Sequence, residues 1–250
     1  MSKAPAVDYA LKIIEFLAVS SGEVGISDIC NALNINKNAT SRVLDALSEQ
    51  NWIYLSNAAQ KKYRLTMKPF SVISKSVEEN NVVKISKPYL EDIHNILGDS
   101  VYLGIRNGDK VLYMLHFDSV KNVRINGCIG GEYPLNCSAP GKVLLAYGER
   151  GETEKYFNGD ISERTEKTVV TAEAFFKEAE KIKANGYAVD DEEFAKGIVC
   201  IACPIFDSNG RAVAAVGISS LTIYDDIETL VNKKYPLIKD AALKISLSLG

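Results

Sequence analysis

The sequence predicts an α+β protein that consists of a small helical N-terminal part and a larger C-terminal part in which helices pack on an antiparallel sheet. Three observations support this class. Apolar residues recur at steps of three and four over residues 7–47, as on one face of an amphipathic helix. Two extended segments follow at 52–55 and 62–65. Beyond residue 82, helical patterns are mixed with extended segments joined by hairpin turns such as Asn107-Gly108.

The N-terminal part has the plan of a winged helix-turn-helix, which we place at residues 1–66. A first helix carries an apolar stripe and ends at Ser20-Ser21-Gly22. A second begins at Ser27, a good N-cap residue, and a third runs over 37–49 after a short break at 34–36. The two extended segments, separated by polar residues 56–60, form a hairpin that would be the wing.

A linker helix is predicted over 67–81 and a second domain over 82–250. Met67, Phe70, Ile73 and Val77 lie at helical steps in the linker. In the second domain we expect strands and helices at intervals along the chain. The strands are 101–106, 110–116, 123–128, 133–136, 186–189, 199–206 and 212–219, and the helices are 83–97, 141–147, 172–184 and 226–249.

Composition narrows the class of protein. The chain has 250 residues, 46% of them hydrophobic, and 29 Lys and Arg residues against 32 Asp and Glu, for a net charge of −3. No apolar run approaches the roughly 18 residues of a membrane span, and an acid at Asp8 argues against a signal peptide. Five cysteines favour reduced thiols over a disulfide framework, so we expect a cytoplasmic protein with no membrane partner.

Double-stranded DNA is the partner that the local charge favours. Residues 36–68 hold six basic and two acidic side chains, a balance of +4 in a negatively charged protein. These cations lie on the third helix and the wing, the parts of a winged helix that face DNA. The candidate DNA-binding residues are Lys37, Asn38, Thr40, Ser41, Arg42, Lys61, Lys62 and Arg64. Arg42 and Asn38 suit base edges, and the wing cations suit the phosphate backbone.

Several sequence blocks resemble the IclR (isocitrate-lyase-regulator) family of bacterial transcriptional regulators over nearly the whole chain. They are 10–17, 37–44 and 63–65 in the N-terminal part, and 136–142 (Asn-Cys-Ser-Ala-Pro-Gly-Lys), 186–193 and 197–205 in the C-terminal part. The resemblance implies a GAF/PAS-like effector-binding domain after the linker. It also implies a homodimer or homotetramer on a palindromic operator and a small carboxylic acid as effector, with no cofactor.

The resemblance also implies where the effector binds, between the sheet and the loop before the short helix. Carried over by motif, the positions are Ile125, Tyr133, Ser138, Ala139, Pro140, Asp190, Ile198, Cys200, Gly217 and Ser219. A loop that enters a helix N-terminus presents N–H groups to a carboxylate, although Pro140 lacks one. Asp190 could accept hydrogen bonds from ligand hydroxyls, which favours a hydroxy or sugar acid.

Competing classes have weaker support. Only two histidines occur, and no nucleophile elbow, Walker loop or dinucleotide fingerprint is present, so we expect no enzyme activity. A thiol- or zinc-sensing regulator would use Cys128, Cys137, Cys200 and Cys203. Cys200 and Cys203 lie an odd number of residues apart in a predicted strand, which puts them on opposite faces. A third alternative is a ligand-binding module whose helix-turn-helix serves only assembly.

Overall fold

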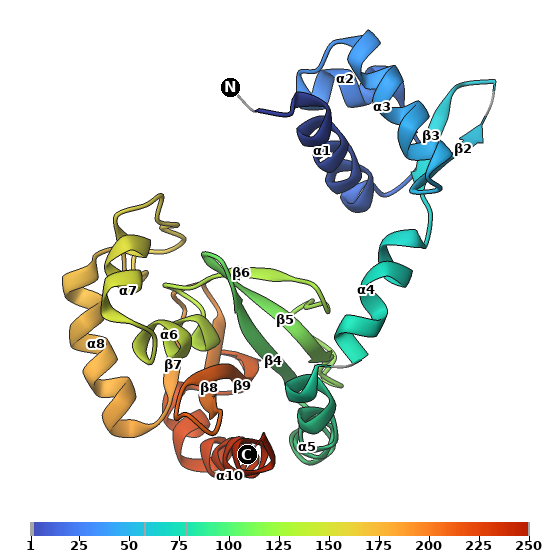
Figure 1. The fold of residues 1–250 in the computed structure, drawn as a ribbon. Helices are drawn as coiled ribbons and strands as arrows, with labels where there is room; N and C mark the ends of the chain where they lie inside the picture. Colours follow the sequence, from blue (N-terminus) through green and yellow to red (C-terminus); the bar gives the residue numbers. More distant parts are fainter. Residues whose placement is uncertain (1–2, 58, 79, 250) are drawn as a thin grey trace. The chain divides into compact units, whose positions relative to one another are not determined.

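The computed structural model describes residues 3–57, 59–78 and 80–249 and divides the chain into two compact units, Met1–Glu79 and Asn80–Gly250 (Figure 1). The first unit is the predicted winged helix-turn-helix. Helices α1 (Pro5–Val19), α2 (Ile26–Leu33) and α3 (Lys37–Glu49) pack around a core of aliphatic side chains, and a small antiparallel sheet completes it. The strands β1 (Val24–Gly25), β2 (Ile53–Asn57) and β3 (Lys62–Leu65) have the order β1-β3-β2. Helix α4 (Lys68–Glu78) follows.

Local signals explain where the helices of this unit begin. Asn36 caps α3, since its side-chain oxygen accepts a hydrogen bond from Ala39 N at 2.9 Å. The predicted start of α2 at Ser27 was wrong. Gly25 is the N-cap instead, because the Asp28 carboxylate accepts its N–H at 3.1 Å and fixes the first turn two residues earlier.

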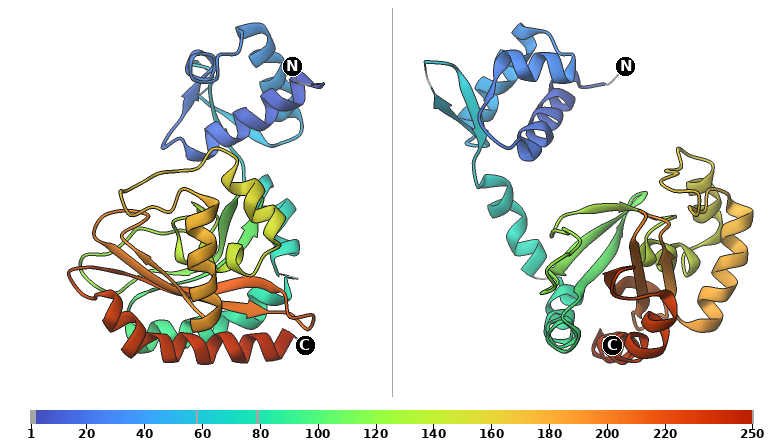
Figure 2. Two further views of the ribbon diagram at one scale, coloured as in Figure 1. Left: turned by 90° about the vertical axis from the view of Figure 1, so that its left-hand side faces the viewer. Right: turned by 180° about the vertical axis from the view of Figure 1, so that it is seen from behind.

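The second unit is built on a six-stranded antiparallel sheet with the order β6-β5-β4-β9-β8-β7. The strands are β4 (Ser100–Asn107), β5 (Lys110–Phe117), β6 (Glu132–Pro134), β7 (Ala188–Asp191), β8 (Ile198–Phe206) and β9 (Ala212–Leu221). Helices α5 (Asn81–Leu97) and α10 (Tyr235–Leu249) pack on one face, and α6 (Ala139–Ala146), α7 (Arg150–Phe157) and α8 (Ala172–Asn185) lie on the other side (Figures 1 and 2). The α+β class is confirmed.

Strand β8 shows why the sheet needs helices on both sides. Its side chains alternate, so that Ile201, Cys203 and Ile205 join the core under α5 and α10. Cys200 and Ala202 face the core under α6 and α8. The apolar run 198–206 is therefore a strand buried on both faces.

Two predicted elements differ from the structure, and one helix of the structure was not predicted. Residues 123–128 are not a strand, because Gly130 N and Gly131 O bond to Tyr113 and the preceding residues run irregularly over the sheet face. Helix α7 was not predicted. The last helix is not continuous, since a short α9 (Ile227–Thr229) and a π-helical turn (Leu230–Lys234) precede α10. None of the helices in the described ranges is long and apolar enough to cross a membrane.

Candidate functional site

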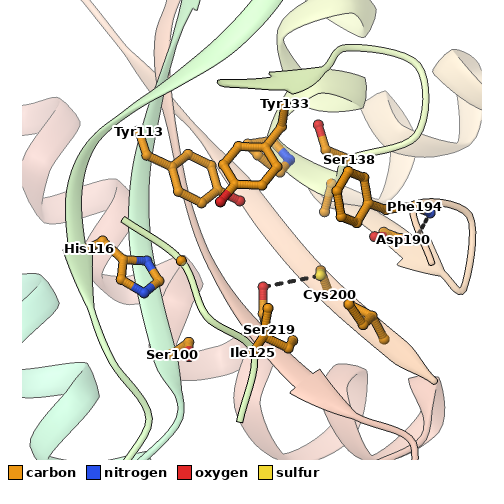
Figure 3. A pocket seen from close by; sticks show the side chains of 14 residues that line it. Ser100, Tyr113, His116, Ile125, Tyr133, Ser138, Asp190, Phe194, Cys200 and Ser219 are labelled. Carbon is orange, nitrogen blue, oxygen red and sulfur yellow. Dashed lines mark hydrogen bonds between the residues drawn. The ribbon is translucent and has the colours of Figure 1, made fainter. Parts of the chain in front are cut away.

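A cavity opens on the α6 side of the large sheet (Figure 3). It holds about 420 Å³ of space between protein atoms, part of it open to solvent. Its lining comes from six strands, the start of α6 and two irregular segments. The lining residues are Ser100, Tyr113, His116, Ile125, Gly127, Tyr133, Ser138, Ala139, Pro140, Asp190, Phe194, Ile198, Cys200 and Ser219.

The register of the sheet explains the polar floor of this cavity. Asp190 pairs with Cys200, Cys200 with Ser219, and Ser219 with Ser100 across four neighbouring strands. Residues directly opposite each other in a ladder point to the same face, so the four side chains form one row. The Cys200 thiol and the Ser219 hydroxyl lie 3.2 Å apart and share a hydrogen bond.

Aromatic rings form one wall of the cavity. Tyr113 stacks on Tyr102 with ring centroids 4.6 Å apart, and the tilted ring of Tyr133 lies 4.3 Å from that of Tyr113. Tyr133 meets the edge of Phe194 at 5.7 Å. Burial raises the pKa values of the Tyr102 and Tyr113 hydroxyls well above the ordinary value, so both remain neutral donors.

The turn into α6 is tightly packed. Ser138 is the N-cap residue, but its hydroxyl donates to Pro134 O at 2.6 Å and is thereby engaged within the turn. Gly141 lies against the preceding chain, and a Cβ there would stand 2.5 Å from Leu135 Cα. Only glycine fits without a shift of the backbone, which explains the Pro140-Gly141 pair.

Asp190 is almost fully buried, with 1% of its surface exposed. Its Oδ1 accepts hydrogen bonds from Glu193 N at 2.7 Å and Phe194 N at 3.1 Å. Burial raises the pKa of this carboxyl to about 6, against the lowering effect of the two backbone donors. The carboxyl therefore both shapes the loop that carries Phe194 and faces the cavity.

A buried ion cluster lies behind the α6 turn. Lys142 has no exposed surface, and its Nζ contacts Glu178 Oε1 at 2.5 Å and Glu193 Oε1. One ammonium thus serves two carboxylates. Burial raises the pKa of Glu193 to about 7. The cluster joins α6 and α8 to the loop after β7.

Nine of the ten positions predicted for the effector line the cavity. Gly217 does not, and its placement there was wrong. A Cβ at Gly217 would meet Ile201 O at 2.5 Å and Tyr102 Oη at 2.7 Å, so this glycine makes room for the Tyr102 ring instead.

Five residues that line the cavity were not predicted from the sequence: Ser100, Tyr113, His116, Gly127 and Phe194. Tyr113 and His116 are three residues apart, an offset that places side chains on opposite faces of a regular strand. In β5 the register shifts between the Leu103–Leu115 and Gly104–Tyr113 pairs, and this irregularity brings both to the cavity. Ser100 could have been predicted from the strand register, because it lies directly opposite Ser219, a residue already predicted to line the site.

The cysteines do not fit a thiolate site. Burial raises the pKa of Cys137 and of Cys203 to about 12 and that of Cys200 well above its ordinary value. Metal ligands and reactive thiols need the thiolate form. The searched part of the chain, residues 3–57, 59–78 and 80–249, holds no group of three or more His, Cys, Asp or Glu side chains suited to a metal ion.

The first unit presents most of its predicted DNA-binding residues to solvent. Lys37, Asn38, Arg42, Lys61 and Arg64 are exposed, and Ser41 and Lys62 are half-buried. Arg42 borders the groove between α1 and α3. Thr40 was predicted as a DNA-binding residue, but it does not reach the surface. It is fully buried, and its hydroxyl donates to Asn36 O at 3.1 Å in the turn between α2 and α3.

Two family descriptions match the chain. Residues 6–55 match the IclR helix-turn-helix domain, and residues 74–247 match the bacterial transcriptional regulator IclR C-terminal domain. Among curated relatives, the HTH-type transcriptional regulator KdgR of Escherichia coli is 28% identical over 100% of this chain and 96% of its own length. The DNA-binding transcriptional repressor YiaJ of E. coli is 30% identical over 85% of this chain and 76% of its own.

Solved structures show the same fold. The IclR protein of Thermotoga maritima superposes with a TM-score of 0.79 and 28% identity, over 98% of this chain and 99% of that one. An IclR homologue of Microbacterium hydrocarbonoxydans, complexed with 4-hydroxybenzoate, superposes with a TM-score of 0.83 over 98% of both chains. At 19% identity the latter likeness concerns the fold alone. The relatives are named as regulators and repressors and not as enzymes.

Proposed function

The chain belongs to the IclR family of bacterial transcriptional regulators, and from this premise we propose that a small hydroxy acid binds in the cavity of the second unit and controls how the first unit binds an operator. The observation that carries the proposal is the cavity itself. Polar side chains from four strands converge on one mostly apolar cavity that is partly open to solvent, and a few convergent polar groups in an apolar lining are typical of small-ligand sites. A thiol or zinc sensor is not favoured, because three of its four cysteines are buried.

The shape of the cavity supports a hydroxy acid with a flat or apolar body. Tyr113, Tyr133 and Phe194 offer ring surfaces for that body. Asp190 offers a carboxylate acceptor to a ligand hydroxyl. The hydroxyls of Ser100 and Ser219 can donate or accept.

Operator binding is proposed for α3 and the β2–β3 hairpin. Lys37, Asn38, Ser41 and Arg42 would meet the major groove, and Lys61, Lys62 and Arg64 the phosphates. A homodimer or homotetramer on a palindromic operator in the cytoplasm would use two such units. Helix α4, which follows the wing, would link them to the second domain. An effector must bind one arrangement of the units better than the other to change DNA binding.

Lys61→Ala is expected to weaken binding to all duplexes alike and to lower the slope of log Kd against log salt by about one. The reason is that a wing lysine neutralises one phosphate without contacting a base. The measurement is fluorescence anisotropy with a duplex that the purified protein selects from a random pool, at several salt concentrations. Lys177→Ala, which removes an exposed lysine from α8, is the matched control and should leave the slope unchanged. Equal slopes for both variants would contradict the proposed wing contact.

A thermal-shift experiment tests the effector class. The probes are three acids, each with an uncharged counterpart: 4-hydroxybenzoate and 4-hydroxybenzamide, gluconate and glucitol, and lactate and lactamide. We expect at least one acid to raise Tm by a few degrees at a concentration about a hundredfold above its Kd. The same acid should change the affinity for the selected duplex. If none of the three acids binds, the proposed effector class is wrong.

A further inference from the structure

We propose that His116 is the residue that binds the carboxylate of the effector, so that the acid lies with its carboxylate at β5 and its hydroxyl at Asp190 on β7. This inference rests on the proposed function. It adds a residue that the sequence analysis missed, and it assigns the carboxylate to a different part of the cavity from the α6 turn.

The placement of His116 is the first observation. Its side chain is only 6% exposed, and its ring lines the cavity beside Tyr113, with ring centroids 6.1 Å apart. Within the part of the chain that the structure describes, its Nδ1 is buried without a hydrogen-bond partner. A buried polar atom that lacks a partner destabilises the protein unless a ligand or water satisfies it.

The surroundings of the ring fix its orientation. His116 Nε2 lies 3.1 Å from Asp118 Oδ1, so with the proton on Nε2 the ring donates to this carboxylate. The backbone of Gly127 packs against Cε1, between the two ring nitrogens, where a Cβ would stand 2.3 Å from Cε1, 2.7 Å from Nε2 and 2.9 Å from Nδ1. Glycine at this position therefore lets the irregular segment close on the ring. With Nε2 engaged, Nδ1 is the ring nitrogen left for a ligand, and it donates to a carboxylate when both ring nitrogens carry a proton.

The distribution of charge separates the two ends of the cavity. Among the lining residues, His116 is the one side chain that can become a cation and Asp190 the one carboxylate. Figure 3 shows His116 on one side and Asp190 on the other, with Phe194 and Ser138 near Asp190. Three strands, β4, β9 and β8, separate the strands that carry them.

The α6 turn is less suited to the carboxylate. Pro140 has no N–H, and the Ser138 hydroxyl already donates to Pro134 O. Asp190 on the same side would repel a second carboxylate. A ligand hydroxyl, which can donate to Asp190, fits this end better.

The test compares an acid with its uncharged counterpart in two variants, by isothermal titration calorimetry. The probes are the 4-hydroxybenzoate and gluconate pairs, because lactate carries its hydroxyl next to the carboxylate and cannot reach both His116 and Asp190. In the wild-type protein we expect the acid of the responding pair to bind more tightly than its counterpart. His116→Gln should weaken the acid between about tenfold and about a hundredfold and leave the counterpart within about threefold, since only the charge-assisted hydrogen bond is lost. His94→Gln, at the other histidine, is the matched control, because His94 lies outside the cavity and bonds to Asp99 O at 2.9 Å.

The outcomes separate this inference from the proposed function. If an acid binds the wild-type protein but His116→Gln weakens acid and counterpart equally or not at all, His116 does not bind the carboxylate, although the effector class stands. If no acid of the three binds the wild-type protein, both proposals are wrong. Duplex binding without effector and the melting temperature show whether each variant is folded, and His116→Asn provides a second, smaller substitution with the same expected loss.

Discussion

Replacing Lys142 by methionine is expected to lower the free energy of unfolding of the second unit by about 3–5 kcal/mol. Lys142 is fully buried, and its ammonium lies between Glu178 and Glu193. Methionine fills a similar volume but leaves both carboxylates without their cation. Removing one partner of a buried ion pair destabilises a protein because the remaining charge is desolvated and no opposite charge compensates for the lost hydration.

The Lys142→Met substitution should also change the shape of the cavity. Glu193 belongs to the loop after β7, and its backbone N–H donates to Asp190. Phe194 is the next residue in that loop and lines the cavity. Lys142 is therefore a positioning residue, which acts on the site through Glu193.

Urea denaturation followed by far-UV circular dichroism measures this effect. The double variant Lys142→Met with Glu193→Gln should recover part of the lost stability, because the buried charge is removed with its partner. Lys177→Met on α8 is the control, since this lysine is 74% exposed and pairs only with Glu173 on the same helix. A change below about 1 kcal/mol in Lys142→Met would show that the cluster is not paired as the structure has it.

The sequence predicts the two-part α+β fold because its signals are local. The apolar stripe of α1, the N-cap Thr171 of α8 and the Asn107-Gly108 hairpin each depend on a few neighbouring residues. Segments without such signals were missed. Residues 123–128 have a strand-like composition and were wrongly predicted as a strand, because Tyr113 N donates to Gly131 O and Gly130 N donates to Tyr113 O, so that the chain pairs with β5 only after this segment.

The cavity could be predicted only in part, for a similar reason. Ser138, Asp190 and Cys200 belong to sequence blocks that resemble the family, so their positions were accessible. Tyr113 and His116 both face the cavity because the register shifts in β5. No residue pattern in the sequence predicts this shift. Thr40 was wrongly predicted to bind DNA because a threonine near a helix start can also turn inward, where its hydroxyl donates to Asn36 O in the preceding turn.

The second large effect is expected at Asp190, where replacement by asparagine should stabilise the protein at neutral pH and not in acid. The pKa of the carboxyl is raised from 3.8 to about 6, chiefly by burial. Between these two pH values the folded protein binds more protons than the unfolded chain, so the free energy of unfolding falls as the pH rises. Two pKa units correspond to roughly 3 kcal/mol, and this cost is fully present above pH 6.

Asparagine imitates the protonated carboxyl. Its Oδ1 can still accept the hydrogen bonds from Glu193 N and Phe194 N, so the loop after β7 should keep its shape. Asp190→Asn should thus exceed the wild-type protein in stability by up to roughly 3 kcal/mol at pH 7.5, and the difference should vanish near pH 4. The pKa of Glu193 is also raised, to about 7. Glu193 is present in both proteins, so its effect on the free energy of unfolding cancels to first order in the difference between Asp190→Asn and the wild-type protein.

Urea denaturation of both proteins at several pH values between 4 and 7.5 measures this difference. Asp226→Asn is the matched control. The pKa of Asp226 is lowered, chiefly by its hydrogen bond to Thr229, so that this substitution should destabilise the protein above pH 4. A stability difference at Asp190 that does not change with pH would contradict the raised pKa. A carboxylate kept at a buried position where an amide would be more stable is best explained by a ligand that needs it, which is why the sign of this difference bears directly on the cavity as a binding site.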